Sequence, residues 1–113
     1  MINIPLMAMP NQRLQTKIDG KTYSLTLSQR TTGMFIDIYA DGVAAALGVV
    51  CIDRAPITAL GFDGAFVFLD NTNNSTNPRY TLLNDSVFLY YLNADEVAWI
   101  AALLRKYYAS HSL

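Results

Sequence analysis

The side chains that most often perform catalysis are few in this sequence, and they lie far apart. Acyl transfer requires a nucleophile, a base and a group that orients the base, but the only histidine, His111, lies in the terminal stretch ASHSL, where chains fray. The only cysteine, Cys51, lies in an apolar run without a basic neighbour in sequence to lower its pKa. We interpret it as a small buried hydrophobic residue. The sequence therefore predicts no catalytic residue, and we expect that the protein is not an enzyme.

Metal ligands are dispersed as well. One cysteine, one histidine and carboxylates scattered from Asp37 to Glu96 give no cluster with the spacing of a metal site. The stretch DNTNN, from Asp70 to Asn74, alternates oxygen ligands as a calcium loop does. It lacks the central glycine and the terminal glutamate of an EF-hand, so we interpret it as the start of a polar loop. We expect no metal and no other cofactor.

Composition favours protein contacts instead. Apolar residues make up 52% of the 113 residues and charged residues only 15%, and exposed apolar area often marks a subunit interface. The formal net charge is −1 and the eight basic residues are scattered, so we expect no nucleic-acid or membrane partner. The apolar run from Gly42 to Ile52 is shorter than the ~18 residues of a membrane span. We predict that it forms a buried strand.

The first half of the chain alternates with the period of a β-sheet. Leu14, Thr16 and Ile18 share one face, and after Asp19-Gly20 the alternation resumes with Tyr23, Leu25 and Leu27. An Asp-Gly pair between two alternating runs predicts a hairpin, because glycine accepts the positive φ of a type I′ turn. A third strand places Met34, Ile36 and Ile38 on one face and ends at a second pair, Asp41-Gly42.

The second half predicts further strands and one helix. Residues 53–64 are interrupted by Pro56 and two glycines and suggest a crossing segment with short extended pieces. The strand AFVFLD has no polar face, which predicts burial on both sides, and SVFLYYL forms the last strand after a polar loop over residues 71–80. About six short strands followed by one helix indicate a small barrel or sandwich.

The helix is predicted from Asn93 to Ser110. Asn93 and Glu96 have the spacing of a capping box, and apolar residues then recur at intervals of three and four. Trp99, Leu103 and Tyr107 widen the apolar surface beyond one stripe, so we expect this helix to pack on its own domain and on another subunit.

We predict a single domain over residues 1–113, with an extended segment at 1–10, the β-structure at 11–92 and the helix at 93–110. The two prolines of Ile2 to Met9 exclude a central strand, so we expect this segment to lie outside the barrel, with Leu6, Met7 and Met9 exposed for docking. Deleting residues 1–9 should then leave folding nearly intact and weaken assembly.

With the elements placed, the order of short motifs resembles the baseplate plug family of contractile-tailed phages. The motifs are IPL at Ile4 to Leu6, PNQ at Pro10 to Gln12, IDGKTYSLTL at Ile18 to Leu27, MFIDIYADG at Met34 to Gly42, GAFVFLD at Gly64 to Asp70 and PRYTLLNDSVFLYYL at Pro78 to Leu92. The resemblance covers residues 2–92. The helix extends beyond the closing strand that is usual in the family, so the resemblance implies nothing about its role.

The resemblance implies a small β-barrel of the OB type. Together with the elements predicted above, we expect a mainly β fold, a small antiparallel barrel of five to six strands followed by the C-terminal α-helix. It also implies a structural, non-enzymatic component of the virion, made in the host bacterial cytoplasm. Such a component lies at the centre of the tail baseplate, helps close the tail tube and contacts hub, tube or spike proteins. We expect a homo- or hetero-oligomer. The candidate interface residues are Ile4, Leu6, Met7, Met9, Tyr91, Trp99, Leu103 and Tyr107.

An alternative function is an OB-type module that binds single-stranded nucleic acid or an oligosaccharide. Eight aromatic residues fall in the predicted strands, and such rings stack on bases or sugars in some barrels. No arginine or lysine is interleaved with them, so we favour packing in the core. Tyr90 and Tyr91 are adjacent and place one ring on each face of the sheet.

Overall fold

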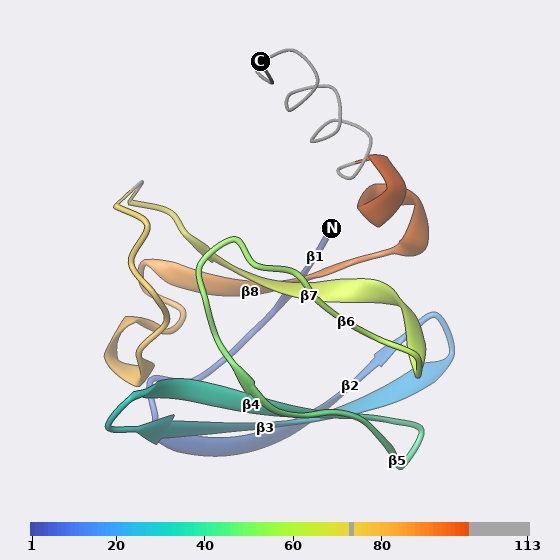
Figure 1. Ribbon diagram of the computed structural model, residues 1–113, viewed down its shortest axis with the longest axis horizontal. Coiled ribbons are helices and arrows are strands. Elements are labelled where there is room, and N and C mark those ends of the chain that lie inside the picture. Colours follow the sequence, from blue (N-terminus) through green and yellow to red (C-terminus); the bar gives the residue numbers. More distant parts are fainter. Residues whose placement is uncertain (73, 100–113) are drawn as a thin grey trace, which may run out of the picture.

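The computed structural model describes residues 1–72 and 74–99, which form two four-stranded antiparallel sheets (Figure 1). The first sheet has the strand order β1 (Ile2–Ile4), β8 (Val87–Leu92), β7 (Phe62–Asp70) and β6 (Ile57–Ala59). The second has the order β2 (Asn11–Ile18), β3 (Lys21–Arg30), β4 (Gly33–Ala40) and β5 (Val43–Val50). A 3-10 turn, η1 (Tyr80–Leu82), precedes β8, and residues 94–99 are helical.

Both Asp-Gly pairs form the predicted turns. Asp19 and Gly20 have φ values of 52° and 80°, and Asp41 and Gly42 have values of 50° and 79°. Positive φ at both central residues is the requirement of a type I′ hairpin. Ile18 pairs with Lys21 across the first turn, and Ala40 pairs with Val43 across the second. These local residues therefore set the register of the β2–β3 hairpin and of the start of the β4–β5 hairpin.

The predicted alternation in that sheet is confirmed. Tyr23, Leu25 and Leu27 are buried on β3, and Met34, Ile36 and Ile38 are completely buried on β4. Leu25 pairs with Ile38 and Leu27 with Ile36, so these residues form one continuous apolar face. That face packs against the first sheet and belongs to one hydrophobic core with it.

Strand β7 is buried on both faces, as its sequence predicts. Phe66 and Phe68 point into the core, whereas Ala65 and Val67 point to the other side of the sheet, and all four are at most 5% exposed. At one end of the core, the ring of Phe66 contacts those of Phe62, Tyr23 and Tyr91, and Tyr23 also contacts Phe62 and Tyr91, with ring centroids 5.2–5.7 Å apart. Edge-to-face contacts of this kind add to the apolar burial.

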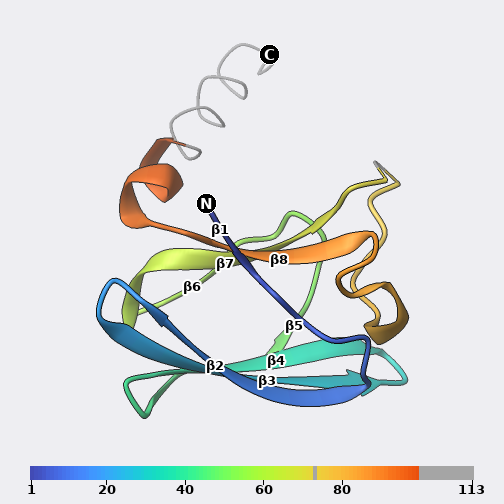
Figure 2. The same cartoon turned by 180° about the vertical axis from the view of Figure 1, so that it is seen from behind.

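The count of strands differs from the prediction of five to six. The described part of the chain has eight, because the N-terminal segment contributes β1 and the crossing segment contributes β6. Within residues 1–72 and 74–99, no hydrogen-bonded ladder joins the two sheets, so the predicted closed barrel is not confirmed. The link from β1 to β2 connects the two sheets on one side of the sandwich, and the link from β5 to β6 connects them on the opposite side (Figures 1 and 2).

The expectation that Ile2 to Met9 lies outside the β-structure is wrong for its first half. Ile2–Ile4 is an edge strand, and its residues pair with Tyr91, Tyr90 and Leu89 of β8. Ile4 is 3% exposed and Leu6 is 6% exposed, so both belong to the core. The prolines do exclude a central position, but an edge strand that ends before Pro5 satisfies the same restriction.

The burial predicted for Gly42 to Ile52 is also wrong. The segment forms a strand, β5, but it lies at the edge of its sheet, and most of its residues are exposed. Gly48 has a φ of 62° and interrupts the pairing with β4, and its N–H donates to Oδ1 of Asp37 over 2.6 Å. An edge strand has a neighbouring strand on one side only, which leaves the other side of β5 in solvent. Only Cys51, which follows β5, is buried as predicted.

The capping box at the start of the helix is confirmed. The N–H of Glu96 donates to Oδ1 of Asn93 over 2.8 Å, and the N–H of Asn93 donates to Oε1 of Glu96 over 3.0 Å. Residues 94–99 follow as helix; the remainder of the predicted helix lies outside the described residues. Among the described residues, no helix combines the length and apolarity needed to cross a bilayer.

Deleting residues 1–9 is expected to destabilise the fold, contrary to the expectation from sequence. The deletion removes the β1–β8 ladder and the buried side chains of Ile4 and Leu6, which corresponds to a loss of roughly 3 kcal/mol or more. Urea unfolding of the purified chain measures this loss. Met7→Ala is the control, because Met7 is exposed and should change stability by about 0.5 kcal/mol or less. An unchanged urea midpoint in the deletion variant would contradict the packing of β1.

Gly64→Ala is expected to lower the free energy of unfolding by about 1–3 kcal/mol. A Cβ atom at Gly64 would overlap the carbonyl oxygen of Leu92 and the ring of Tyr91, and backbone atoms cannot move aside freely. The same urea experiment measures the effect, with Thr58→Ala at an exposed position of β6 as the control. Equal stability of the two variants would show that β7 and β8 are not in this register.

Candidate functional site

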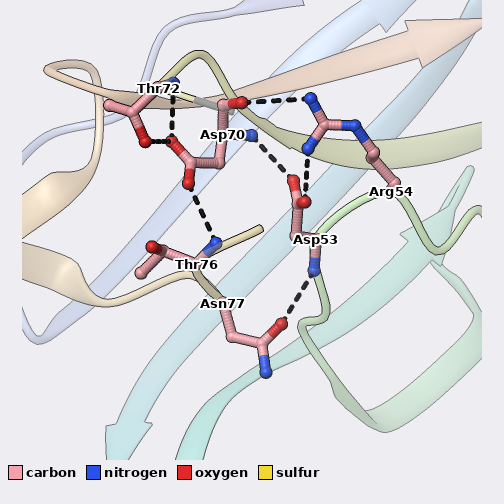
Figure 3. Close-up of polar contacts among 6 residues, drawn as sticks. All are labelled: Asp53, Arg54, Asp70, Thr72, Thr76 and Asn77. Carbon is pink, nitrogen blue, oxygen red and sulfur yellow. Dashed lines mark hydrogen bonds and ion pairs between the residues drawn. The ribbon is translucent and has the colours of Figure 1, made fainter. Parts of the chain in front are cut away.

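A network of polar side chains organises one end of the molecule, where β7 leads into the polar loop (Figure 3). Asp70 ends β7, and Asp53 lies beside it because Asp53 forms a parallel bridge with Phe68. Oδ1 of Asp53 accepts the N–H of Asp70 over 2.8 Å, and its Oδ2 forms an ion pair with Arg54. Oδ1 of Asn77 accepts the N–H of Asp53 over 3.1 Å and ties the far end of the loop to the network.

Asp70 holds the loop from its first residue. Its carboxylate accepts the N–H and the hydroxyl of Thr72 at 2.9 Å and 2.6 Å, and the N–H of Thr76 at 2.9 Å. These hydrogen bonds lower the pKa of Asp70 from its ordinary value of 3.8 to about 2. The stretch that resembles a calcium loop is thus a loop organised by its own aspartate. Within the described ranges there is no group of three or more residues suited to hold a metal ion.

Two tyrosines lie at the opposite end of the core, next to the helix start. Tyr23 and Tyr91 line a pocket of about 340 Å³ together with Ile18, Asp19, Lys21, Asp63, Asn93, Ala94 and Asp95. Burial, and then the hydrogen bond with Tyr91, raise the pKa of Tyr23, so its hydroxyl stays protonated. Both rings belong to the aromatic cluster of the core. They are packing residues and do not present a flat platform for a base or a sugar.

Cys51 has the environment of a structural residue. It is 2% exposed, and burial raises the pKa of its thiol to about 12. The thiolate is the reactive form, and a thiol with this pKa is protonated at neutral pH. The burial of Cys51 that the sequence predicts is therefore confirmed. His111 lies outside the described residues.

The candidate interface residues separate into three groups. Ile4, Leu6 and Tyr91 are buried in the core of the chain, and the predicted exposure of Leu6 is wrong. Met7, Met9 and Trp99 have exposed side chains. Leu103 and Tyr107 lie outside the described residues. The fold brings Met7 and Met9 together in the link between β1 and β2, whereas Trp99 belongs to the helical stretch.

Sequence reasoning missed a second group of exposed apolar residues. Val43, Leu47 and Val50 of β5, with Ile52 just beyond it and Leu60 in the turn between β6 and β7, are all at least 41% exposed. The turn lies against β5, since a Cβ atom at Gly61 would be 3.0 Å from Cβ of Ala45. Gly48 was the indication of this exposure in the sequence, because a glycine inside a strand often marks irregular pairing. The apolar residues on both sides of it favoured the prediction of a buried strand instead.

Replacing Asp70 with asparagine is expected to lower the thermal midpoint at pH 7 and to flatten its dependence on pH. The carboxylate has a lower pKa in the folded state, so its contribution is complete above pH ~4 and is lost as the pH falls toward 2. Thermal melts at pH 7, 4, 3 and 2 measure both effects. Asp85→Asn removes an exposed carboxylate and is the control. If Asp70→Asn has the pH dependence of the unmodified chain, the loop is not held by this carboxylate.

Comparison with known families places these features in context. A family model described as "Cyanophage baseplate Pam3 plug gp18" matches residues 1–95. The match includes all eight strands and ends within the helical stretch over residues 94–99. None of the curated proteins compared with the chain matches it.

Proposed function

The chain belongs to the cyanophage baseplate plug family, and from this premise we propose that it is a structural component of a phage tail baseplate, acting through protein contacts. The observation that carries the proposal is the family match, which extends over 95 of the 113 residues. The protein is a plug or hub-associated subunit, and its partners are other baseplate proteins of the hub, tube or spike. It is synthesised in the cytoplasm of the host bacterium and is then assembled into the virion or into a tail-derived injection machine.

The described side chains support a role in contact rather than in chemistry. Asp53, Asp70 and Glu96 bind backbone N–H groups, and Cys51 is buried with a raised pKa. At the same time, ten large apolar side chains are exposed within the described residues. Exposed apolar area of this extent is typical of a subunit that is covered in an assembly. The body of two sheets is compatible with the OB-type barrel of the family, and barrel closure remains a prediction.

The alternative function, binding of single-stranded nucleic acid or oligosaccharide, receives less support. Such binding relies on open aromatic rings beside basic side chains, whereas Tyr23, Phe66, Phe68 and Tyr91 are buried. Phe35 is half-buried, and Arg30 lies 4.8 Å from the centre of its ring. One such pair does not make a groove that follows a nucleic-acid backbone.

The proposal predicts that the chain co-purifies with baseplates. Tails are isolated from the source particles, baseplates are separated from tubes and capsids, and each fraction is analysed by quantitative mass spectrometry. We expect the chain in the baseplate fraction at a fixed ratio to the other baseplate proteins, and we expect depletion from the capsid fraction, which is the control. Absence from baseplates would contradict the proposal. So would a purified chain that binds oligonucleotides with an affinity that falls steeply with salt.

A further inference from the structure

The exposed apolar side chains gather mainly in two groups on the β-structure. The first group, the β1 edge patch, consists of Met1, Ile2, Met7 and Met9. The second group, the β5 edge patch, consists of Val43, Leu47, Val50, Ile52 and Leu60. Met7 is 64% exposed and Val43 69%, and Leu60 has no cover from its own chain. These residues are unusual for edges, which are protected in most β-proteins by charged side chains.

The two patches lie on opposite sides of the sandwich. The strand orders β1-β8-β7-β6 and β2-β3-β4-β5 place β1 at one end of the first sheet and β5 at the far end of the second. β1 leads directly to β2 on one side, and β5 leads to β6 on the other. β5 and its link to β6 face the viewer in Figure 1, whereas β1 crosses in front of the first sheet in Figure 2.

The segments that carry most of the two patches also lack charged side chains. Residues 1–12 contain no charged side chain, and neither do residues 42–52. The amino group of Met1 is already paired with Glu96, and this contact lowers the pKa of Glu96. The outer face of β2, by contrast, carries exposed Arg13 and Lys17. Two charged groups lie beside the β5 edge patch, and both are hydrogen-bonded to its backbone: Lys21 to the carbonyl oxygen of Gly61 and Asp37 to the N–H of Gly48. Burying the two patches against each other would therefore remove apolar area from water while these charged groups stay at the rim of the contact.

We propose that the β1 edge patch of one copy of this chain binds the β5 edge patch of the next copy. Pairing of β5 with β5 through a two-fold axis would leave the β1 edge patch exposed, whereas a head-to-tail contact covers both. A heterologous contact of this kind forms a ring when the rotation closes. The inference rests on the proposed function only in treating protein contact as the role of the chain.

Side chains, rather than an extended ladder, make this contact. β1 has three residues and ends before Pro5, which has no N–H to donate. The pairing of β5 is shifted at two places, and the N–H of Gly48 is already bound to Asp37. Neither edge therefore offers a long regular template for another strand. The flexible side chains of Met7 and Met9 suit contact with an irregular surface such as β5 and the Leu60 turn.

The test uses the purified full chain and two variants, Met7→Glu and Leu47→Glu, each of which places a charge in one patch. Analytical ultracentrifugation over a concentration series measures self-association, and thermal melts establish that both variants fold. We expect the unmodified chain to self-associate and each variant to do so at least about tenfold more weakly. Thr81→Glu introduces the same charge at an exposed position outside both patches and is the control. It should associate like the unmodified chain.

Mixing the two variants distinguishes the modes of contact. Met7→Glu keeps an intact β5 edge patch and Leu47→Glu keeps an intact β1 edge patch, so the mixture should form a dimer with one copy of each. A purified chain that stays monomeric overturns the inference, as does Met7→Glu self-associating like the unmodified chain, which would indicate β5–β5 pairing. Failure here leaves the co-purification with baseplates untouched, because that experiment does not depend on self-association.

Discussion

Phe66 and Phe68 of β7 share one core with Leu25, Ile36 and Ile38 of the other sheet, and this burial of two apolar faces against each other holds the molecule together. Each sheet alone would leave its inner face in water, at a cost of about 25 cal/mol for each Å². The links β1 to β2 and β5 to β6 pass from one sheet to the other. Strands of both sheets contribute side chains to this core.

The carboxylates serve the backbone of the same structure. Of the nine acidic residues, five accept hydrogen bonds from backbone N–H groups of turns, loops or strand ends. Asp37 binds Gly48, Asp41 binds Thr22, Asp53 binds Asp70, Asp70 binds Thr72 and Thr76, and Glu96 binds Asn93. A backbone N–H without a partner costs free energy when it leaves water. These five side chains therefore stabilise irregular backbone.

Membership of a baseplate plug family is consistent with the exposed apolar side chains at two edges of this sandwich. Charged side chains protect the edge strands of many β-proteins, and in this chain Arg13 and Lys17 give such protection to the edge strand β2. The uncharged β1 and β5 edges are suited to a protein whose neighbours cover them.

The sequence by itself determined the elements whose causes are local. The Asp19-Gly20 and Asp41-Gly42 turns, the alternation of β3 and β4, and the Asn93–Glu96 capping box all depend on residues a few positions apart. The order of short motifs likewise indicated the family that the family model then matched. Tertiary structure decided which strands lie at an edge. The burial of Leu6 and the exposure of Leu47 depend on strand partners far away in the chain, because an apolar run is identical in sequence whether a neighbouring strand covers it or not.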